Sequence, residues 1–295
     1  MHVMPFVAEV FAPTAPIKAT KFVAEILACN FKQAQSYIDR GRLTTLQGQK
    51  IHKAQILNEP VRLLFFKPTS CPEFAPIFAT PHFALYFKPK NLYSHPKNYT
   101  THSLYESIYA NNPQARLIHR LDYETSGLVL TSQAKAHEKP LRELFSSRQV
   151  VKTYAALVQG DLRAYASGAF SVVLPIVEPA SIRGDLGVRS KIDKAGKFSA
   201  TTIEIQSYDP QTNQTRLKVI PLTGRTHQIR LHLSYLGYPL VGEPLYIEDM
   251  DARAYLDAKK ADFVGEFGRH KTKLALEAVG LSFSLYGLRY ALYLN

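Results

Sequence analysis

Residues 119–130 read HRLDYETSGLVL and join two apolar runs. The run at 115–121 is apolar enough for a buried strand, and residues 128–131 have the pattern of a second strand. A short polar turn that ends in glycine separates them. Side chains alternate between the two faces of an extended backbone, so Arg120 and Asp122 lie on the same face. The sequence therefore predicts a carboxylate and a guanidinium at the end of a rigid strand, where reacting groups are commonly held.

Two interpretations of this segment are open from its residues alone. Aspartate is a common turn residue, so Asp122 can simply begin a turn beside a solvated Arg120. On the other side, His-Arg-Leu-Asp followed by Thr-Ser-Gly-Leu resembles the catalytic segment of the RluA group of RNA pseudouridine synthases. This resemblance implies that Asp122 is the essential catalytic residue. It also implies an α+β fold, with a mixed, mostly antiparallel sheet that carries a cleft across its middle.

Composition favours a soluble, globular protein with a polyanionic partner. The chain has 295 residues, 46% of them hydrophobic, which is enough for one large and one small domain. Its net charge of +12 suits nucleic acid first and an anionic membrane surface second. The two cysteines form no CxxC motif and no Cys/His cluster, so we expect a reduced, cytoplasmic chain without a metal site. The sequence contains no run of about 18 or more apolar residues, so it predicts no membrane span.

The first 67 residues have the pattern of a small α/β domain. Two amphipathic helical patterns, at 18–30 and 32–40, precede a glycine at position 41 and a Gln-Gly turn at 47–48. This arrangement resembles the S-four-type RNA-binding domain, which implies a basic face that contacts RNA. An ordinary solvated surface is the alternative. The basic residues expected on this face are Lys32, Arg40 and Arg42.

Four prolines between positions 68 and 81 predict a semi-rigid linker, 68–82, ahead of a catalytic domain at 83–295. The domain opens with a strand pattern that ends in Lys88 and a proline, similar to the first segment of the family. Lys88 is a candidate phosphate contact, or otherwise a solvated lysine. A later strand pattern, 150–160, contains Lys152 and Tyr154. It resembles the family segment that contributes an active-site tyrosine, whereas without the resemblance Tyr154 is best interpreted as packing on a sheet.

A second specific match lies at 222–232, which reads LTGRTHQIRLH. The glycine permits a tight turn, and Thr226 is a candidate N-cap for a helix that ends near Gly237. The resemblance implies that Arg225 pairs with the catalytic Asp122. The chain departs from the family at Glu277, where a histidine is usual, which we interpret as a peripheral change. Residues 249–269 have the character of an insertion, helical in part, with no assigned function.

The chemistry implied by the resemblance needs few groups. Converting uridine to pseudouridine breaks the N-glycosidic bond, rotates the uracil and rejoins it to the ribose through carbon. This isomerisation requires neither a redox cofactor nor a metal ion, but it does require a carboxylate in a water-poor pocket. The target nucleotide must leave its stack, and Arg120 is a candidate to fill the vacated space.

The resulting hypothesis is an RNA pseudouridine synthase that acts as a monomer on large-subunit ribosomal RNA, with transfer RNA as the second candidate. A non-catalytic RNA-binding assembly factor and a base deaminase are the rival classes. The deaminase requires His/Cys zinc ligands, which the sequence lacks. The predicted catalytic residues are Asp122, Tyr154 and Arg225. The predicted RNA contacts are Lys32, Arg40, Arg42, Lys88, His119, Arg120 and Lys152.

Overall fold

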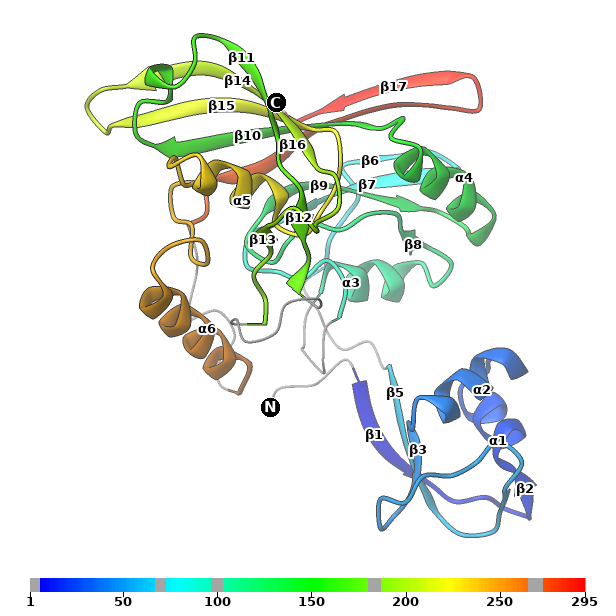
Figure 1. Ribbon diagram of the computed structural model, residues 1–295. Helices are drawn as coiled ribbons and strands as arrows, with labels where there is room; N and C mark the ends of the chain where they lie inside the picture. Colours follow the sequence, from blue (N-terminus) through cyan, green and yellow to red (C-terminus); the bar gives the residue numbers. More distant parts are fainter. Residues whose placement is uncertain (1–5, 67–72, 97–102, 180–186, 265–272, 295) are drawn as a thin grey trace. The chain divides into compact units, whose positions relative to one another are not determined.

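The computed structural model describes residues 6–66, 73–96, 103–179, 187–264 and 273–294 (Figure 1). The chain divides into two compact units, Met1–Cys71 with Pro96–Thr101 and Pro72–His95 with His102–Asn295. The domain boundaries predicted from the sequence stay a prediction, with one correction. Within the predicted linker 68–82, whose first five residues lie outside the described ranges, Phe78–Ala79 forms a strand of the larger unit's sheet. A pair of residues can therefore join a sheet edge despite the surrounding prolines.

The smaller unit packs two helices against a three-stranded antiparallel sheet in the order β1-β5-β3. Amphipathic spacing produces this packing, because Phe22 and Val23 of α1 and Ile38 of α2 meet Leu63 of β5 in one core. A capping box begins α2, in which the Asn30 side chain accepts from the Gln33 N–H at 2.9 Å. The elements are β1 Phe6–Phe11, β2 Ile17–Lys18, α1 Ala19–Ile26, α2 Phe31–Asp39, β3 Leu43–Thr45, β4 Ile56–Leu57 and β5 Val61–Phe66.

The larger unit is built on a ten-stranded sheet in the order β11-β14-β15-β10-β16-β9-β7-β6, with β17 beside β16 and β8 beside β9. Every strand pair in it is antiparallel except β16 with β9. The predicted α+β class with a mixed, mostly antiparallel sheet is therefore confirmed. Its strands are β6 Phe78–Ala79, β7 Phe83–Lys88, β8 Arg116–Leu117, β9 Ser126–Ser132, β10 Val151–Gln159, β11 Ala169–Val173, β14 Ala200–Asp209, β15 Gln214–Pro221, β16 Leu276–Leu285 and β17 Leu288–Tyr293.

Helices lie on both faces of this sheet (Figure 1). Along β9, Leu128 and Leu130 face the core that includes Leu141 of α4, whereas Val129 faces the core that includes Ile108 of α3. This burial on both sides explains why three consecutive residues of β9, Leu128–Leu130, are apolar. The remaining elements are α3 Leu104–Asn111, α4 Lys135–Ser146, the 3₁₀ turn η1 Leu162–Ala164, α5 Gln228–Tyr235, α6 Asp249–Val264 and the separate pair β12 Ile176–Val177 with β13 Lys191–Ile192.

The approach of β9 to its parallel neighbour β16 depends on Gly127. Its φ is +118°, in the region that favours glycine, and an added Cβ would overlap the backbone of Ala278. The glycine of the 119–130 segment is thus required by the sheet itself. The strand predicted before it is shorter than expected, because only Arg116–Leu117 pairs with β9 and residues 118–122 are irregular.

Candidate active site

Asp122 lies in the irregular segment between β8 and β9, and this segment is fixed by hydrogen bonds on both sides. The Ser94 hydroxyl accepts from the Leu121 N–H at 3.0 Å and donates to the Leu121 carbonyl at 2.9 Å. The Thr125 N–H donates to the Asp122 carbonyl at 3.2 Å and closes the turn. The backbone of Asp122 is therefore set by its neighbours, and its side chain, 31% exposed, remains open to a substrate.

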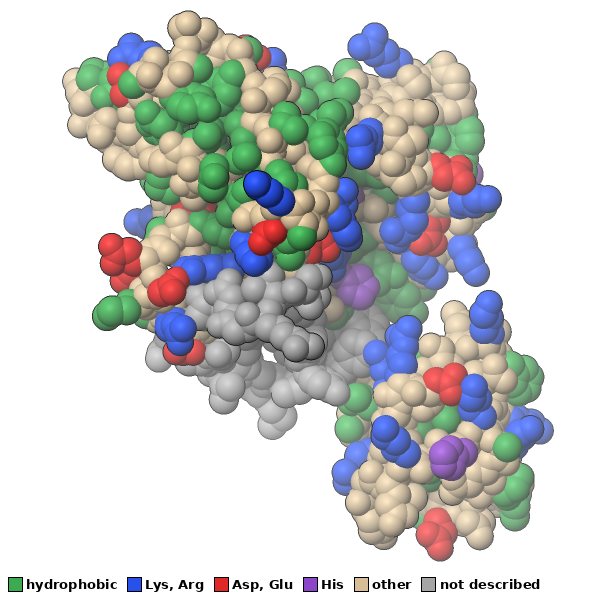
Figure 2. Space-filling view, viewed as in Figure 1, with side chains coloured by type: hydrophobic (Ala, Val, Ile, Leu, Met, Phe, Trp, Pro, Cys, Tyr) green, Lys and Arg blue, Asp and Glu red, His purple; other side chains and the backbone are tan. Residues whose placement is uncertain are grey.

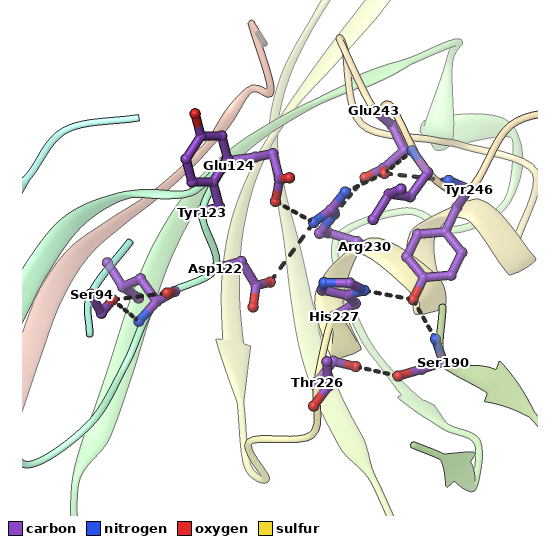
Figure 3. Close-up of polar contacts among 12 residues, drawn as sticks. Ser94, Asp122, Tyr123, Glu124, Ser190, Thr226, His227, Arg230, Glu243 and Tyr246 are labelled. Atoms are coloured by element: carbon purple, nitrogen blue, oxygen red, sulfur yellow. Dashed lines mark hydrogen bonds and ion pairs between the residues drawn. The ribbon is translucent and has the colours of Figure 1, made fainter. Parts of the chain in front are cut away.

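Arg230 of α5 is the cation that faces Asp122 (Figure 3). Its Nη1 lies 4.0 Å from Asp122 Oδ2 and 3.0 Å from Glu124 Oε2. Its Nε and Nη2 donate to the two oxygens of Glu243 at 2.8 and 2.6 Å, a bidentate pair. The Arg230 side chain is completely buried, so this geometry is rigid. Burial alone would lower the pKa of Arg230, but the carboxylates of Glu243, Glu124 and Asp122 raise it above its ordinary value, so the guanidinium stays charged.

The arrangement corrects the prediction that Arg225 pairs with Asp122. The Arg225 side chain is half-buried, and its Nε donates to the Phe198 carbonyl at 3.3 Å. Thr226 is likewise not the N-cap, because His227 occupies that position with no side-chain cap bond. The helix therefore begins one residue later than an N-cap at Thr226 requires, and Arg230, the second arginine of the 222–232 segment, faces Asp122. Residues 228–233 of α5 are all buried. In the sequence, Arg230 stands between the apolar residues Ile229 and Leu231, and a buried arginine needs acidic partners, so this position could have pointed to an internal ion pair.

The helix α6 reaches this ion-pair cluster from the segment that we predicted as an insertion. The Tyr255 hydroxyl donates to Glu124 Oε1 at 2.5 Å, so Glu124 binds Tyr255 through one oxygen and Arg230 through the other. At the start of α6, Asp249 forms an ion pair with Arg189 at 2.5 Å. Sequence reasoning did not find Tyr255 or Glu124, because no local pattern joins positions 131 residues apart.

Two further residues line the segment around Asp122. Tyr154 of β10 packs against the core that contains Leu121 and Val129. Burial, and then the charge of Asp122, raise the pKa of Tyr154, so it is a neutral phenol at neutral pH. Glu277 accepts a hydrogen bond from the Ser126 hydroxyl at 2.7 Å, opposite Ser126 in the β16–β9 pair. Position 277 therefore lies beside the 119–130 segment and is not peripheral to it.

Three of the predicted RNA contacts have internal partners instead. Lys88 is completely buried, and its ammonium donates to the carbonyls of Pro89, Leu92 and Tyr123 at 2.9, 2.8 and 3.3 Å. Lys152 donates to the Thr223 carbonyl at 3.0 Å, and burial lowers the pKa of Lys152 to about 8. These two lysines stabilise the loops on either side of the site, because each ammonium binds loop carbonyls rather than facing solvent.

His119 also has a structural partner. Its Nε2 accepts from the Leu130 N–H at 3.1 Å, and its ring stacks on Phe145 with centroids 4.8 Å apart. Burial, and then the charge of Lys152, lower the pKa of His119 to about 3, so the ring is neutral. His119 thus ties the irregular segment to β9. Of the predicted contacts in the larger unit, Arg120 is the one whose side chain is exposed.

The smaller unit carries the other predicted contacts. Lys32 and Arg40 are exposed, and the Arg42 guanidinium lies over the Tyr37 ring at 5.2 Å. Figure 2 shows Lys and Arg side chains spread over the visible face of this unit, with fewer acidic side chains among them. Within the described ranges, no three His, Cys, Asp or Glu side chains are arranged to bind a metal ion. Nor does any helix in those ranges have the length and hydropathy to cross a membrane.

Comparisons with known proteins identify the family of the chain. The family model for RNA pseudouridylate synthase matches residues 82–235, which contain Asp122, Tyr154 and Arg230. A Helicobacter pylori protein described as an uncharacterized RNA pseudouridine synthase is 42% identical over 290 residues, 97% of this chain and 93% of that protein. The ribosomal large subunit pseudouridine synthase C of Haemophilus ducreyi is 33% identical over 162 residues, 54% of this chain and 48% of that protein.

Among solved structures, human RNA Pseudouridylate Synthase Domain Containing 1 shares the fold. It matches with a TM-score of 0.57 and 22% identity, over 78% of this chain and 86% of that chain. The family model and the relative of nearly full length both concern the same reaction. The chain belongs to the RNA pseudouridylate synthase family and is an isomerase that acts on RNA.

Proposed function

We propose that Asp122 is the catalytic residue of this pseudouridine synthase and that Arg230 is the cation that faces and orients its carboxylate. The observation that carries this proposal is the distance of 4.0 Å between Asp122 Oδ2 and Arg230 Nη1. A charged carboxylate that is partly exposed, next to a cation that is wholly buried, can react with a substrate while its counter-charge stays fixed. Glu243 and Glu124 prevent Arg230 from turning away, since Glu243 binds its Nε and Nη2 and Glu124 binds the same Nη1 that faces Asp122.

Tyr154 has a different role in this proposal. Because its pKa is raised by burial and by the charge of Asp122, it is unsuited to remove a proton as a phenolate. A neutral aromatic ring beside the carboxylate can instead stack on the uracil and keep its plane in position while the glycosidic bond breaks. Tyr154 is therefore proposed to stack on the uracil.

RNA recognition is proposed to use both units. Arg120, exposed and two residues before Asp122, is the candidate to occupy the stack that the target uridine leaves. Lys32, Arg40 and Arg42 are the candidates for phosphate contacts in the smaller unit. The S-four-type identity of that unit also belongs to this proposal. It is supported by two helices packed on a small sheet and by the basic side chains of Figure 2.

The proposed target is large-subunit ribosomal RNA, with transfer RNA as the alternative. The name of the Haemophilus ducreyi relative favours the ribosomal target. The test is to map pseudouridines in total RNA from cells that lack this gene, and from the same cells supplied with the wild-type or the Asp122→Asn gene. We expect a missing site in large-subunit RNA that only the wild-type gene restores. Loss of a site in transfer RNA alone would contradict the ribosomal assignment, and restoration by Asp122→Asn would contradict the catalytic one.

A further inference from the structure

His227 stands at the start of α5 in a left-handed backbone conformation, with φ of +56°. This conformation is uncommon for residues other than glycine, although asparagine, aspartate and histidine adopt it more often than the rest. Its Nδ1 lies 3.0 Å from the Tyr246 hydroxyl. Figure 3 shows the His227 ring between Tyr246 and Asp122.

The hydrogens around Tyr246 decide which nitrogen of His227 carries a proton. The Tyr246 oxygen accepts from the Ser190 N–H at 3.0 Å, and the Ser190 hydroxyl donates to the Thr226 carbonyl at 2.9 Å. The phenol has one hydrogen, and among the described residues its acceptor is His227 Nδ1. Burial raises the pKa of Tyr246 and lowers that of His227, so both groups are neutral at neutral pH. A neutral histidine that accepts through Nδ1 carries its hydrogen on Nε2.

The second ring nitrogen of His227, Nε2, lies on the side that faces Asp122. Figure 3 shows this nitrogen on the side of Asp122 and Arg230, and the charge of Asp122 acts on the His227 ring. The hydrogen bonds among the described residues include none from His227 Nε2. The chain thus fixes a neutral donor beside the catalytic carboxylate and leaves it available to a substrate.

We propose that His227 is a further catalytic residue, whose Nε2–H donates a hydrogen bond to a carbonyl oxygen of the uracil as it leaves the ribose. When the bond between the ribose carbon and the uracil nitrogen breaks, its electron pair stays with the uracil, and negative charge spreads to the carbonyl oxygens. The donor stabilises this charge without giving up its proton. When the uracil carbon bonds to the ribose, an electron pair of the uracil anion forms the new bond. The hydrogen on that carbon then leaves as a proton, its electron pair stays in the ring, and the ring nitrogen released from the ribose takes up a proton from solvent, so the composition of the RNA is unchanged.

The proposal rests on Asp122 being the catalytic residue, and two substitutions test it separately from that assignment. His227→Gln places an amide N–H near the position of Nε2, whereas His227→Asn places its amide near Nδ1 and leaves no donor at the far position. Asparagine is the better residue at positive φ, so the Asn variant should be at least as stable as the Gln variant. Activity should follow the opposite order, with the Gln variant more active than the Asn variant. The kcat of the Asn variant should be about tenfold or more below that of wild type.

The measurements are kcat and KM on the RNA substrate, the melting temperature of each variant, and the ¹⁵N–¹H spectrum of the His227 ring. We expect kcat to follow wild type, then Gln, then Asn, with little change in KM, and the ring hydrogen on Nε2. A kcat that follows the melting temperatures, an Asn variant as active as wild type, or a ring hydrogen on Nδ1 would each overturn the role of His227. Turnover by Asp122→Asn would instead refute the assignment of Asp122, and this proposal with it.

Discussion

Replacing Arg230 by lysine keeps the positive charge opposite Asp122 but removes the planar, forked guanidinium that carries it. At 4.0 Å the two charges interact by about 4 kcal/mol at an effective dielectric constant of about 20, less some screening because Asp122 is 31% exposed. A lysine ammonium ends about 2 Å short of the guanidinium and lacks its fork, which reduces this interaction to about 3 kcal/mol. The difference corresponds to a kcat about tenfold lower.

The assay is release of the hydrogen from the uracil carbon, followed with tritium at that position, under saturating RNA. Arg225→Lys is the matched control, since its side chain donates to the Phe198 carbonyl and makes no ion pair with Asp122 among the described residues. We expect Arg225→Lys to keep kcat within about twofold of wild type. A large loss of kcat in Arg225→Lys together with a wild-type kcat in Arg230→Lys would refute the assignment of Arg230 as the partner of Asp122.

Three other expectations test separate parts of the structure. Tyr255→Phe removes the hydroxyl that donates to Glu124, so kcat should fall several-fold, whereas Tyr208→Phe, which removes a distant exposed hydroxyl, should leave it unchanged. His119 should make stability acid-sensitive. The pKa of His119 is about 3 in the folded protein and 6.5 in its ordinary, unfolded state. The contribution of the neutral ring to the free energy of unfolding is therefore complete above pH 6.5, and about 2 kcal/mol of it is lost at pH 5. His119→Gln can still accept from Leu130 and does not titrate, so its unfolding free energy should fall less between pH 7 and pH 5; an equal fall would contradict the buried neutral ring. Finally, three basic residues of the smaller unit can be exchanged for glutamine together: Lys32, Arg40 and Arg42. The triple variant should bind RNA more weakly, and the slope of log affinity against log salt concentration should become shallower by about two to three. An unchanged slope would exclude these residues as phosphate contacts.

The sequence predicted the elements of the larger unit well where the pattern was local. The strand predicted at 150–160 follows directly from the alternation of its side chains, and it is confirmed as β10 within a residue at each end. The prediction that the apolar run before Asp122 is a strand was wrong beyond Leu117. The apolar side chain of Leu121 is buried because it packs in a core with α3, and not because its backbone belongs to a strand of the sheet. Apolar character alone does not distinguish these two origins.

The site was less predictable, because its geometry depends on contacts between distant segments. The 119–130 and 222–232 matches brought Asp122 and α5 together, but the arginine that they implied, Arg225, is not the one that faces Asp122. Which arginine faces Asp122 depends on where α5 begins. His227 sets this start by its left-handed backbone, which the local sequence pattern did not predict. Basic residues near the site were predicted as RNA contacts from charge alone, whereas Lys88 and Lys152 bind carbonyl groups inside the fold.

The claim on which the rest depends is that the Asp122 carboxylate performs the isomerisation. Its most direct test is pseudouridine formation in a single turnover, with Asp122→Asn in excess over its RNA and RNA binding measured in parallel. The Asn side chain keeps the shape of the carboxyl group and loses its charge, so we expect bound RNA, a melting temperature near that of wild type and no pseudouridine. Appreciable pseudouridine formed by the pure Asn variant would contradict the catalytic role of Asp122.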